Sequence, residues 1–511
     1  MTTLHDALNA WWPTASQRAR KRGGTPTIEY VGTVEHIGDG VATVSGLPTI
    51  RLDEMLLFED GSRGLAFRVA TDAVSCALLG AGNNISAGSR VRGTGDIIRV
   101  PVGETLLGRI VDSTGAPLDG GPAIGADRYE PIERPAPSIV DRDPVTQSLM
   151  TGLTVIDAMI PLGRGQRELI IGDRKTGKTA IAVDTMINQR DSGTICVYAA
   201  IGQKSSTVNR VVDAVREHGA FDRCIFVVGA ADAPPGAQWI TPYAACTMAE
   251  YFRDRGRDAL LIIDDLTKHA IIYRQLSLLL RKPPGREAYP GDVFYVHARL
   301  LERAAKLSAN LGGGSLTALP IAETQAGNLT AYIPTNLISI TDGQIYLEPK
   351  LFYEGQKPAV NVGMSVSRVG GKAQAPAMKA LAEKLRLQYA QFLELEVFTR
   401  FAAMLDARTE HTIAHGRRIR AILAQREYEP LSLAEQVALL LAAEEGKLDT
   451  VPLGRFNAFK AGFTARLREH CPRAIARIGE TGALCDEDRA DIIAALDDFL
   501  RNTELQQNGK T

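Results

Sequence analysis

The segment Gly172-Asp173-Arg174-Lys175-Thr176-Gly177-Lys178-Thr179 places glycines, a lysine and a hydroxyl at a spacing that can hold phosphate groups. It fits the pattern G-x-x-x-x-G-K-[ST], in which the glycines let the backbone wrap an anion and the lysine reaches the β- and γ-phosphates. In this pattern the hydroxyl of the last residue, here Thr179, is a ligand for Mg²⁺. We therefore predict that this segment binds the phosphate groups of a nucleotide together with Mg²⁺.

The residues on either side of this segment support the prediction. Residues 168–171 form an apolar run typical of a buried strand, and residues 180–188 continue with helical spacing. A loop between a strand and the start of a helix offers free backbone N–H groups and the positive end of the helix dipole to an anion. The alternative is a chance match in a glycine-rich chain, and the order of strand, loop and helix argues against it.

A second apolar run, residues 259–263, ends in the acidic pair Asp264-Asp265. An acidic residue at the end of a buried strand is typical of nucleotide sites in which a carboxylate holds the Mg²⁺ shell. We assign this role to Asp264. Asp265 fits a different role, as the residue that caps a helix over residues 266–280.

Two more polar residues stand at the ends of extended runs. Gln203 follows the strand predicted for residues 194–201, and strand ends of this kind form the ligand crevice of open α/β sheets. An amide can orient water but cannot accept its proton, so Gln203 taken alone leaves both a hydrolytic and a non-hydrolytic site open, and it could also be a polar strand-end residue without a nucleotide role. Arg368 follows Ser365-Val366-Ser367, a short extended run. Either it forms a structural ion pair or it neutralises phosphoryl charge in a neighbouring site, which contributes roughly 10³–10⁵ in rate.

Four stretches of the chain must position these residues. Residues 1–26 predict a short helix over residues 3–12 and a basic linker, and residues 27–100 show short alternating runs with turn glycines, typical of a β-barrel, with a sandwich as the alternative. Residues 101–373 alternate apolar strands with helical segments and predict a parallel-sheet P-loop (RecA-like) domain. Residues 374–511 predict an α-helical bundle, including a capping box at Ser432 and Glu435.

Composition excludes several classes of protein. Apolar residues make up 45% and charged residues 23%, which is globular rather than disordered. The formal net charge of −1 predicts no general affinity for nucleic acid. No run approaches the roughly 18 apolar residues of a membrane helix, so any membrane role must come through partners. The six cysteines lack metal-ligand spacing and predict buried thiols in a reducing compartment.

Taken together, three motifs resemble the α subunits of F-type ATP synthases. They are residues 164–174 (RGQRELIIGDR), residues 281–287 (RKPPGRE) and residues 365–370 (SVSRVG). The resemblance spans roughly residues 28–500. It implies a non-catalytic Mg-ATP site on this chain, because catalytic β subunits carry a glutamate where this chain has Gln203. It also implies that Arg368, positioned by Ser365, completes the catalytic site of a neighbouring β chain.

The resemblance implies further site residues and some departures from the family pattern. Pro358 and Gln425 are expected beside the adenine base. Lys175 replaces a usual glutamine in the phosphate loop, Lys357 replaces an arginine before Pro358, and Glu427 replaces a glutamine of the base pocket. Because of these three changes, the resemblance does not predict which base the site prefers or how tightly it binds the nucleotide. The N-terminal segment also differs from the family's usual stator-binding helix.

The resemblance also implies partners and a location. We expect alternating β subunits in a ring of three α and three β chains, a γ central stalk and a peripheral stalk. The complex would work as an ion-transporting ATP synthase on the cytoplasmic face of the bacterial inner membrane, with protons or sodium as the coupling ion. The alternatives are a self-sufficient hexameric secretion-export ATPase, an RNA helicase, and a structural subunit that binds no nucleotide. Gln203 argues against the first, the barrel's lack of a basic-aromatic patch against the second, and Lys178 with Thr179 against the third.

Overall fold

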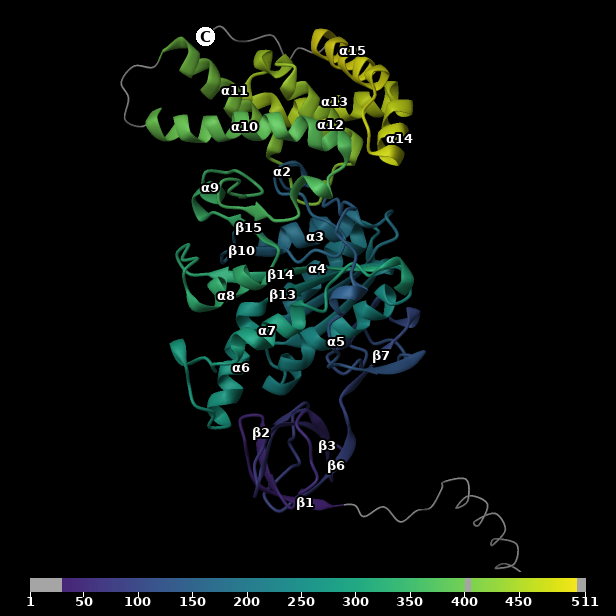
Figure 1. The fold of residues 1–511 in the computed structure, drawn as a ribbon, viewed down its shortest axis with the longest axis vertical. Helices are drawn as coiled ribbons and strands as arrows, with labels where there is room; N and C mark the ends of the chain where they lie inside the picture. The colour runs from purple at the N-terminus through teal and green to yellow at the C-terminus, as the bar shows by residue number, and fades with distance from the viewer. Residues whose placement is uncertain (1–29, 400–405, 503–511) are drawn as a thin grey trace, which may run out of the picture.

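The computed structural model describes residues 30–399 and 406–502, which form three parts stacked along the long axis of the molecule (Figure 1). A barrel lies at one end, an α/β domain in the middle and a helical domain at the other end. The predicted multidomain fold class is therefore confirmed. The predicted helix over residues 3–12 and the basic linker lie outside the described residues.

The N-terminal part is a closed barrel of six strands in the order β1-β2-β5-β4-β3-β6. Antiparallel pairing of β1 with β6 closes it, which decides between the barrel and the sandwich. Alternate side chains, such as Val34, Val44 and Leu56, fill its interior. The strands are β1 (Val31–Gly38), β2 (Val41–Ser45), β3 (Glu54–Phe58), β4 (Arg63–Val69), β5 (Val74–Leu78) and β6 (Arg90–Ile97).

The central part is built on an eight-stranded sheet in the order β16-β15-β10-β14-β13-β11-β12-β8. All neighbours pair in parallel except β15 and β16. The strands are β8 (Arg109–Asp112), β10 (Leu169–Asp173), β11 (Ile195–Gln203), β12 (Cys224–Ala230), β13 (Asp258–Asp264), β14 (Ser315–Thr324), β15 (Gly343–Leu347) and β16 (Val366–Ser367). A separate ribbon pairs β7 (Arg99–Val102) with β9 (Arg128–Pro131).

Helices cover both faces of this sheet, so its strands are apolar on both sides. In β11, for example, Cys196 and Tyr198 pack into one apolar cluster, and Ile195 and Val197 pack into the other. The helices are α2 (Thr154–Met159), α3 (Lys178–Asn188), α4 (Ser205–Glu217), α5 (Pro235–Arg253), α6 (Leu266–Leu279), α7 (Val293–Leu301), α8 (Tyr332–Ile340) and α9 (Pro349–Tyr353). The apolar runs in the sequence predict β10 to β13, but they do not single out β14 and β15, which flank β10.

The C-terminal part is helical, as predicted. Its helices are α10 (Pro376–Thr399), α11 (Ala407–Leu423), α12 (Leu433–Glu444), α13 (Phe456–His470), α14 (Pro472–Thr481) and α15 (Asp486–Asn502). The capping box is confirmed, since Ser432 and Glu435 exchange side-chain and backbone hydrogen bonds at the start of α12. In this region the periodicity of the sequence predicts helices over residues 455–470 and 487–500 but not α14, although Pro472 at its first turn and Gly482, with a φ of 67° at its end, are ordinary helix signals.

The cysteine prediction is correct for five of the six thiols. Cys485 is exposed, and its Sγ lies 3.1 Å from a carboxylate oxygen of Asp488. Within the described residues, no helix is both long and apolar enough to cross a membrane.

Candidate functional site

The phosphate-binding pattern forms the turn between β10 and α3, at the carboxyl edge of the parallel sheet. Gly177 precedes the helix with a φ of 97°, a conformation that L side chains rarely adopt. A Cβ at Gly172 would lie 2.6 Å from the carbonyl oxygen of Leu347 on the neighbouring strand. Both glycines are therefore needed for the turn, which leaves the first N–H groups of α3 without partners inside the helix.

Lys178 lies at the start of α3 and is buried. Its Nζ donates to the carbonyl oxygens of Gly172 at 2.9 Å and Asp173 at 2.6 Å, so the ammonium spans the loop. Burial lowers the pKa of Lys178, while the carboxylates of Glu323 and Asp265 oppose that shift. The loop therefore holds a positive charge in a nearly dry position.

Asp264 ends β13 and lies beside the loop. Its Oδ2 accepts hydrogen bonds from Thr179 Oγ1 at 2.8 Å and from the hydroxyl of Tyr198 at 2.7 Å. Its Oδ1 accepts a hydrogen bond from Gln203 Nε2 at 2.9 Å. The structure thus brings together three of the predicted site residues around one carboxylate. Sequence analysis missed Tyr198, although a single hydroxyl in an apolar buried strand needs a polar partner.

The residues around Asp264 fit a hard divalent cation. Magnesium prefers oxygen ligands and keeps several waters, and here a hydroxyl and a carboxylate are adjacent at the edge of the phosphate loop. Asp265 takes the other role considered for the acidic pair. Its Oδ1 accepts a hydrogen bond from the backbone N–H of Lys268 at 2.7 Å, which caps α6.

The remaining loop residues differ in how they are held. Oδ1 of Asp173 accepts hydrogen bonds from Thr324 and from the backbone N–H of Gly327, which ties the loop to the end of β14. Arg174 is mostly exposed and forms an ion pair with Glu323. Among the other predicted contacts, Thr176 Oγ1 donates to the carbonyl of Asp173 within the turn, and Lys175 is exposed with a φ of 63°.

A shallow pocket continues from the loop over α3. Its lining includes Thr176 and Ile181, Phe352 with residues 357–359, and Gln425 with Glu427. Pro358 and Gln425 therefore meet at one pocket. The Gln425 amide is already engaged, since its Nε2 donates to the carbonyl of Gly152 at 2.7 Å and its Oε1 accepts from Thr154 N at 3.1 Å. The charged side chains of Lys357 and Glu427 are the exposed polar groups of this pocket.

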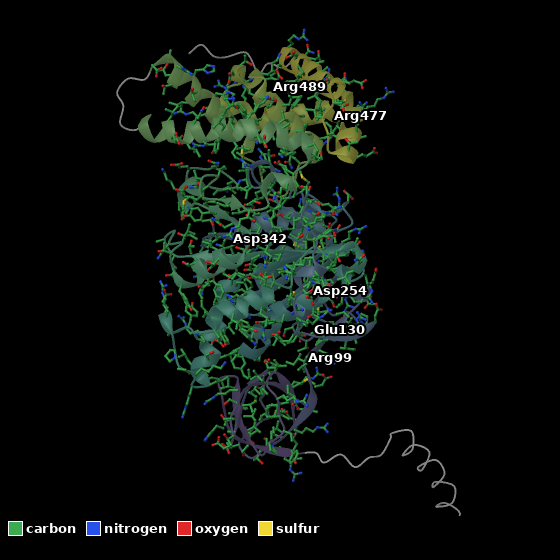
Figure 2. The ribbon with its side chains drawn as sticks, viewed as in Figure 1. Arg99, Glu130, Asp254, Asp342, Arg477 and Arg489 are labelled. Atoms are coloured by element: carbon green, nitrogen blue, oxygen red, sulfur yellow. The ribbon has the colours of Figure 1, made fainter. Side chains whose placement is uncertain are left out.

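Arg368 lies away from the loop. Its backbone N–H donates to the carbonyl of Asp342, the residue before β15, at 2.8 Å. Asp342 lies within the central domain (Figure 2). β15 pairs with β10 such that Leu347 is opposite Gly172. Five residues of strand separate Asp342 from Leu347, which is about 16 Å at the rise of a β-strand. Arg368 and the phosphate loop are therefore at opposite ends of the same strand pair.

The side chain of Arg368 is exposed and lines an open hollow of about 300 Å³ with Arg167, Lys306 and Lys372. Among the described residues, no carboxylate forms an ion pair with Arg368. Ser365 is buried, and its hydroxyl donates to the carbonyl of Asn361 at 2.7 Å and accepts a hydrogen bond from the backbone of Tyr346 at 2.9 Å. Ser365 therefore fastens the Arg368 segment to β15.

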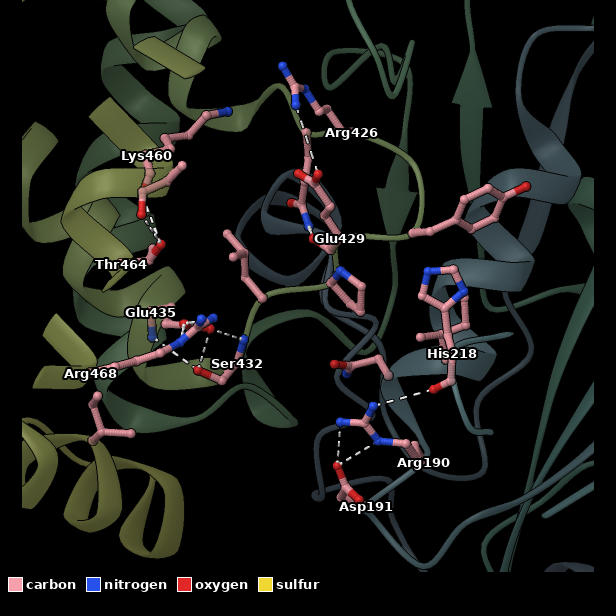
Figure 3. Close-up of a pocket in the computed structure, with 18 of the residues that line it drawn as sticks. Arg190, Asp191, His218, Arg426, Glu429, Ser432, Glu435, Lys460, Thr464 and Arg468 are labelled. Atoms are coloured by element: carbon pink, nitrogen blue, oxygen red, sulfur yellow. Dashed lines mark hydrogen bonds and ion pairs between the residues drawn. The ribbon is translucent and has the colours of Figure 1, made fainter. Parts of the chain in front are cut away.

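A larger hollow of about 710 Å³ lies between the central and helical domains (Figure 3). Its charged side chains pair among themselves, as in Arg190 with Asp191 and Arg468 with Glu435. Lys460 donates to carbonyl oxygens at the end of α11. The hollow is therefore polar, but its charges are satisfied within the chain.

The parallel sheet, the glycine-rich turn and the carboxylate at the end of β13 define a P-loop nucleotide-binding protein. Comparison with known proteins narrows this class. Residues 152–367 match the ATP synthase alpha/beta family, nucleotide-binding domain, and residues 374–499 match the ATP synthase alpha/beta chain, C terminal domain. The chain belongs to the ATP synthase alpha/beta family.

Relatives in this family match nearly the whole chain. ATP synthase subunit alpha 3 of Paraburkholderia xenovorans (strain LB400) is 54% identical over 97% of this chain and 93% of its own length. ATP synthase subunit alpha 2 of Gluconobacter oxydans (strain 621H) is 52% identical over 97% of this chain and 98% of its own length. ATP synthase subunit alpha 1 of P. xenovorans is 57% identical over 87% of each chain.

Proposed function

We propose that this chain is the non-catalytic, α-type subunit of an F-type ATP synthase. It binds Mg-ATP on its own phosphate loop without appreciable hydrolysis and lends Arg368 to a nucleotide held by a neighbouring β subunit. What carries the proposal is the position of Arg368, which is exposed, without an ion pair to the described residues, and at the far end of β15 from the loop. Because Arg368 lies at the far end of β15 from the phosphates of its own site, we infer that its charge acts on a nucleotide held by another chain.

The surroundings of Gln203 support the non-catalytic part of the proposal. Hydrolysis needs a group that orients the attacking water and takes its proton. The Gln203 amide donates a hydrogen bond to Asp264, and an amide, unlike a carboxylate, cannot accept the proton of the attacking water. Thr179 and Asp264 would hold Mg²⁺, which neutralises phosphate charge when it is bound. Lys178 and the loop N–H groups then bind and orient the phosphates.

The names of the relatives support the proposed assembly. As an α subunit, the chain would alternate with β subunits in a ring around a γ stalk, with a peripheral stalk outside it. The head would lie on the cytoplasmic face of the bacterial inner membrane. ATP turnover in the ring would be coupled to transport of protons or sodium ions by membrane subunits, which gives the complex its role as a translocase.

The test is reconstitution of the complex with its β and γ partners, using wild-type chain and Arg368→Ala. Turnover should fall by roughly 10³-fold or more, because a positive charge is missing from the transition state. Binding of ATP to the isolated variant should remain normal. Lys379→Ala is the matched control, since Lys379 is also an exposed cation but does not line the Arg368 hollow.

Two results would contradict the proposal. Normal cooperative turnover by the Arg368→Ala complex would exclude the role of Arg368 in a neighbouring site. Fast ATP hydrolysis by the pure wild-type chain, without partners, would instead favour a self-sufficient hexameric ATPase.

A further inference from the structure

Glu168 is a buried carboxyl group that the phosphate site does not use. It lies directly before β10, and its side chain is 0% exposed. Its Oε2 accepts a hydrogen bond from Gln166 Nε2 at 2.7 Å, whereas Oε1 has no hydrogen-bond partner among the described residues. An ionised carboxylate in such a position is costly, and burial raises the pKa of Glu168 well above its usual range. Burial without a cationic partner in contact within the described parts of the chain therefore favours the neutral form of this group.

One side-chain amide connects Glu168 to the segment that carries Arg368. Gln166 Oε1 accepts a hydrogen bond from the backbone of Gly163 at 2.8 Å, which fixes the orientation of the amide. Its Nε2 therefore has both hydrogens available, one for Glu168 Oε2 and one for Ser367 Oγ at 3.1 Å. Ser367 is the residue immediately before Arg368.

The backbone of β15 and β16 packs so closely against Glu168 that no side chain fits between its carboxyl group and the strand before Arg368. Ser367 pairs with Gly343 across β16 and β15. A Cβ at Gly343 would lie 2.6 Å from Glu168 Oε2 and 2.1 Å from the carbonyl oxygen of Val366. The carboxyl group is therefore packed directly against β16, the strand that precedes Arg368.

The charged groups that face Glu168 come from the same corner of the sheet. Asp342, before β15, disfavours the ionised form, and Arg368, after β16, favours it. From its own segment Gln166 supplies a hydrogen bond, and from β14 the carbonyl of Ala318 accepts the Glu168 backbone N–H at 3.0 Å. Arg368 is thus the cation whose electrostatic interaction with Glu168 changes when Glu168 gains or loses its proton.

We propose that Glu168 is a positioning residue for Arg368 and that it works in its protonated form. The inference rests on the proposed function of Arg368. A neutral Glu168 supports Ser367 through Gln166 without attracting the guanidinium, which stays exposed toward the neighbouring chain. An ionised Glu168 places a negative charge in a dry site beside that guanidinium and draws it inward, away from the partner's nucleotide. The orphan oxygen Oε1 is the acceptor that it would meet.

The consequence is a pH dependence of turnover in the assembled complex. Above the pKa of a carboxyl group, its neutral fraction falls about tenfold for each pH unit. Turnover should therefore decline at alkaline pH as Glu168 ionises. Glu168→Gln keeps an oxygen acceptor for Gln166 and cannot ionise, so this variant should keep its kcat over the pH range in which the wild type declines. KM should change little, because Glu168 does not contact the nucleotide.

The experiment measures kcat and KM of the reconstituted complex from neutral to alkaline pH. It compares wild type, Glu168→Gln, Arg368→Ala and the double variant. We expect Glu168→Gln to lose the alkaline decline, and the double variant to follow Arg368→Ala at every pH. Glu302→Gln is the matched control, because it removes a carboxylate that pairs with Arg167 in the same region without touching Gln166. It should keep the wild-type decline.

Each outcome separates the two proposals. If Arg368→Ala turns over normally, the proposed function itself fails. If Arg368→Ala is impaired but Glu168→Gln declines like the wild type, only the role of Glu168 is overturned. If Glu168→Gln does not assemble, infrared titration of the isolated wild-type and Arg368→Ala chains decides. Loss of the nearby cation must move the titration of a protonated carboxyl band to higher pH, and an unchanged titration contradicts the inference.

Discussion

The hydroxyl of Thr179 and the carboxylate of Asp264 are 85 residues apart in the chain and 2.8 Å apart in the fold. Thr179 lies in the first turn of α3, which follows β10 and the phosphate loop, Asp264 ends β13, and β14 lies between the two strands. The parallel arrangement brings both strand ends to the same edge of the sheet. This contact joins the phosphate loop to the proposed magnesium ligand.

Asp264→Asn should weaken binding of Mg-ATP to the isolated chain by about 10- to 100-fold, since hydrogen bonds to charged groups contribute roughly 1.5–3 kcal/mol. Binding of ATP in EDTA should change much less. Calorimetric titration with and without Mg²⁺ measures both values. Asp265→Asn is the control, because asparagine still caps α6. A larger magnesium effect for Asp265→Asn than for Asp264→Asn would reverse the assignment.

Asp184 makes stability depend on pH. Burial, with the nearby charge of Glu427, raises the pKa of Asp184 from 3.8 to about 7. The folded chain therefore holds this proton more tightly than the unfolded chain, and the contribution of Asp184 to stability falls as pH rises from about 4 to 7. In Asp184→Asn the free energy of unfolding should no longer show this fall, which in the wild type amounts to up to about 4 kcal/mol over the pH range. Urea unfolding at pH 4.5 to 8 measures it.

A control for the Asp184 prediction is Glu427→Gln. This variant removes the neighbouring charge while keeping the Asp184 carboxyl group, so the fall in stability should end at lower pH and be smaller in total, with its start near pH 4 unchanged. Equal pH slopes for the wild type and Asp184→Asn would contradict the prediction.

Arg303 forms a buried ion pair with Glu250, at 2.7 Å, and its guanidinium also donates to the carbonyl of Ile132. Arg303→Met should lower the free energy of unfolding by about 3–5 kcal/mol, because a buried carboxylate loses its main partner. Arg99→Ala breaks an exposed pair with Asp96 and should leave the unfolding midpoint unchanged. Similar losses in thermal unfolding for both variants would contradict this account.

Gly343→Ala should disturb the pairing of β15 with β16, because its Cβ would lie 2.1 Å from the carbonyl oxygen of Val366 and the φ of Gly343 is 156°. Turnover of the reconstituted complex should fall, because the disturbed pairing displaces Arg368. ATP binding to the isolated chain should remain unchanged. Gly291→Ala is the control, since no atom lies within 4 Å of its Cβ position. Unchanged turnover in Gly343→Ala would count against the need for this close approach.

Local features of the sequence predicted much of the molecule. The strand, loop and helix around residues 172–179 follow each other along the chain. The capping box also involves near neighbours in the sequence, Ser432 and Glu435. Apolar runs identified β10 to β13 because strands buried on both faces need apolar residues at every position. Helix α14 carried comparable local signals, and they were overlooked.

Other features depend on residues that the chain brings together only by folding. The neighbours of β10 are β14 and β15, and strand order is not written in any local pattern. The partner of Tyr198 is Asp264, and the hydrogen bond from Gln166 to Ser367 joins residues 201 positions apart. The sequence by itself predicted a phosphate loop at residues 172–179 and placed Gln203 at the end of a buried strand. Only the tertiary structure decided which end of the sheet carries Arg368 and which buried groups support it, because sheet register and burial set those distances.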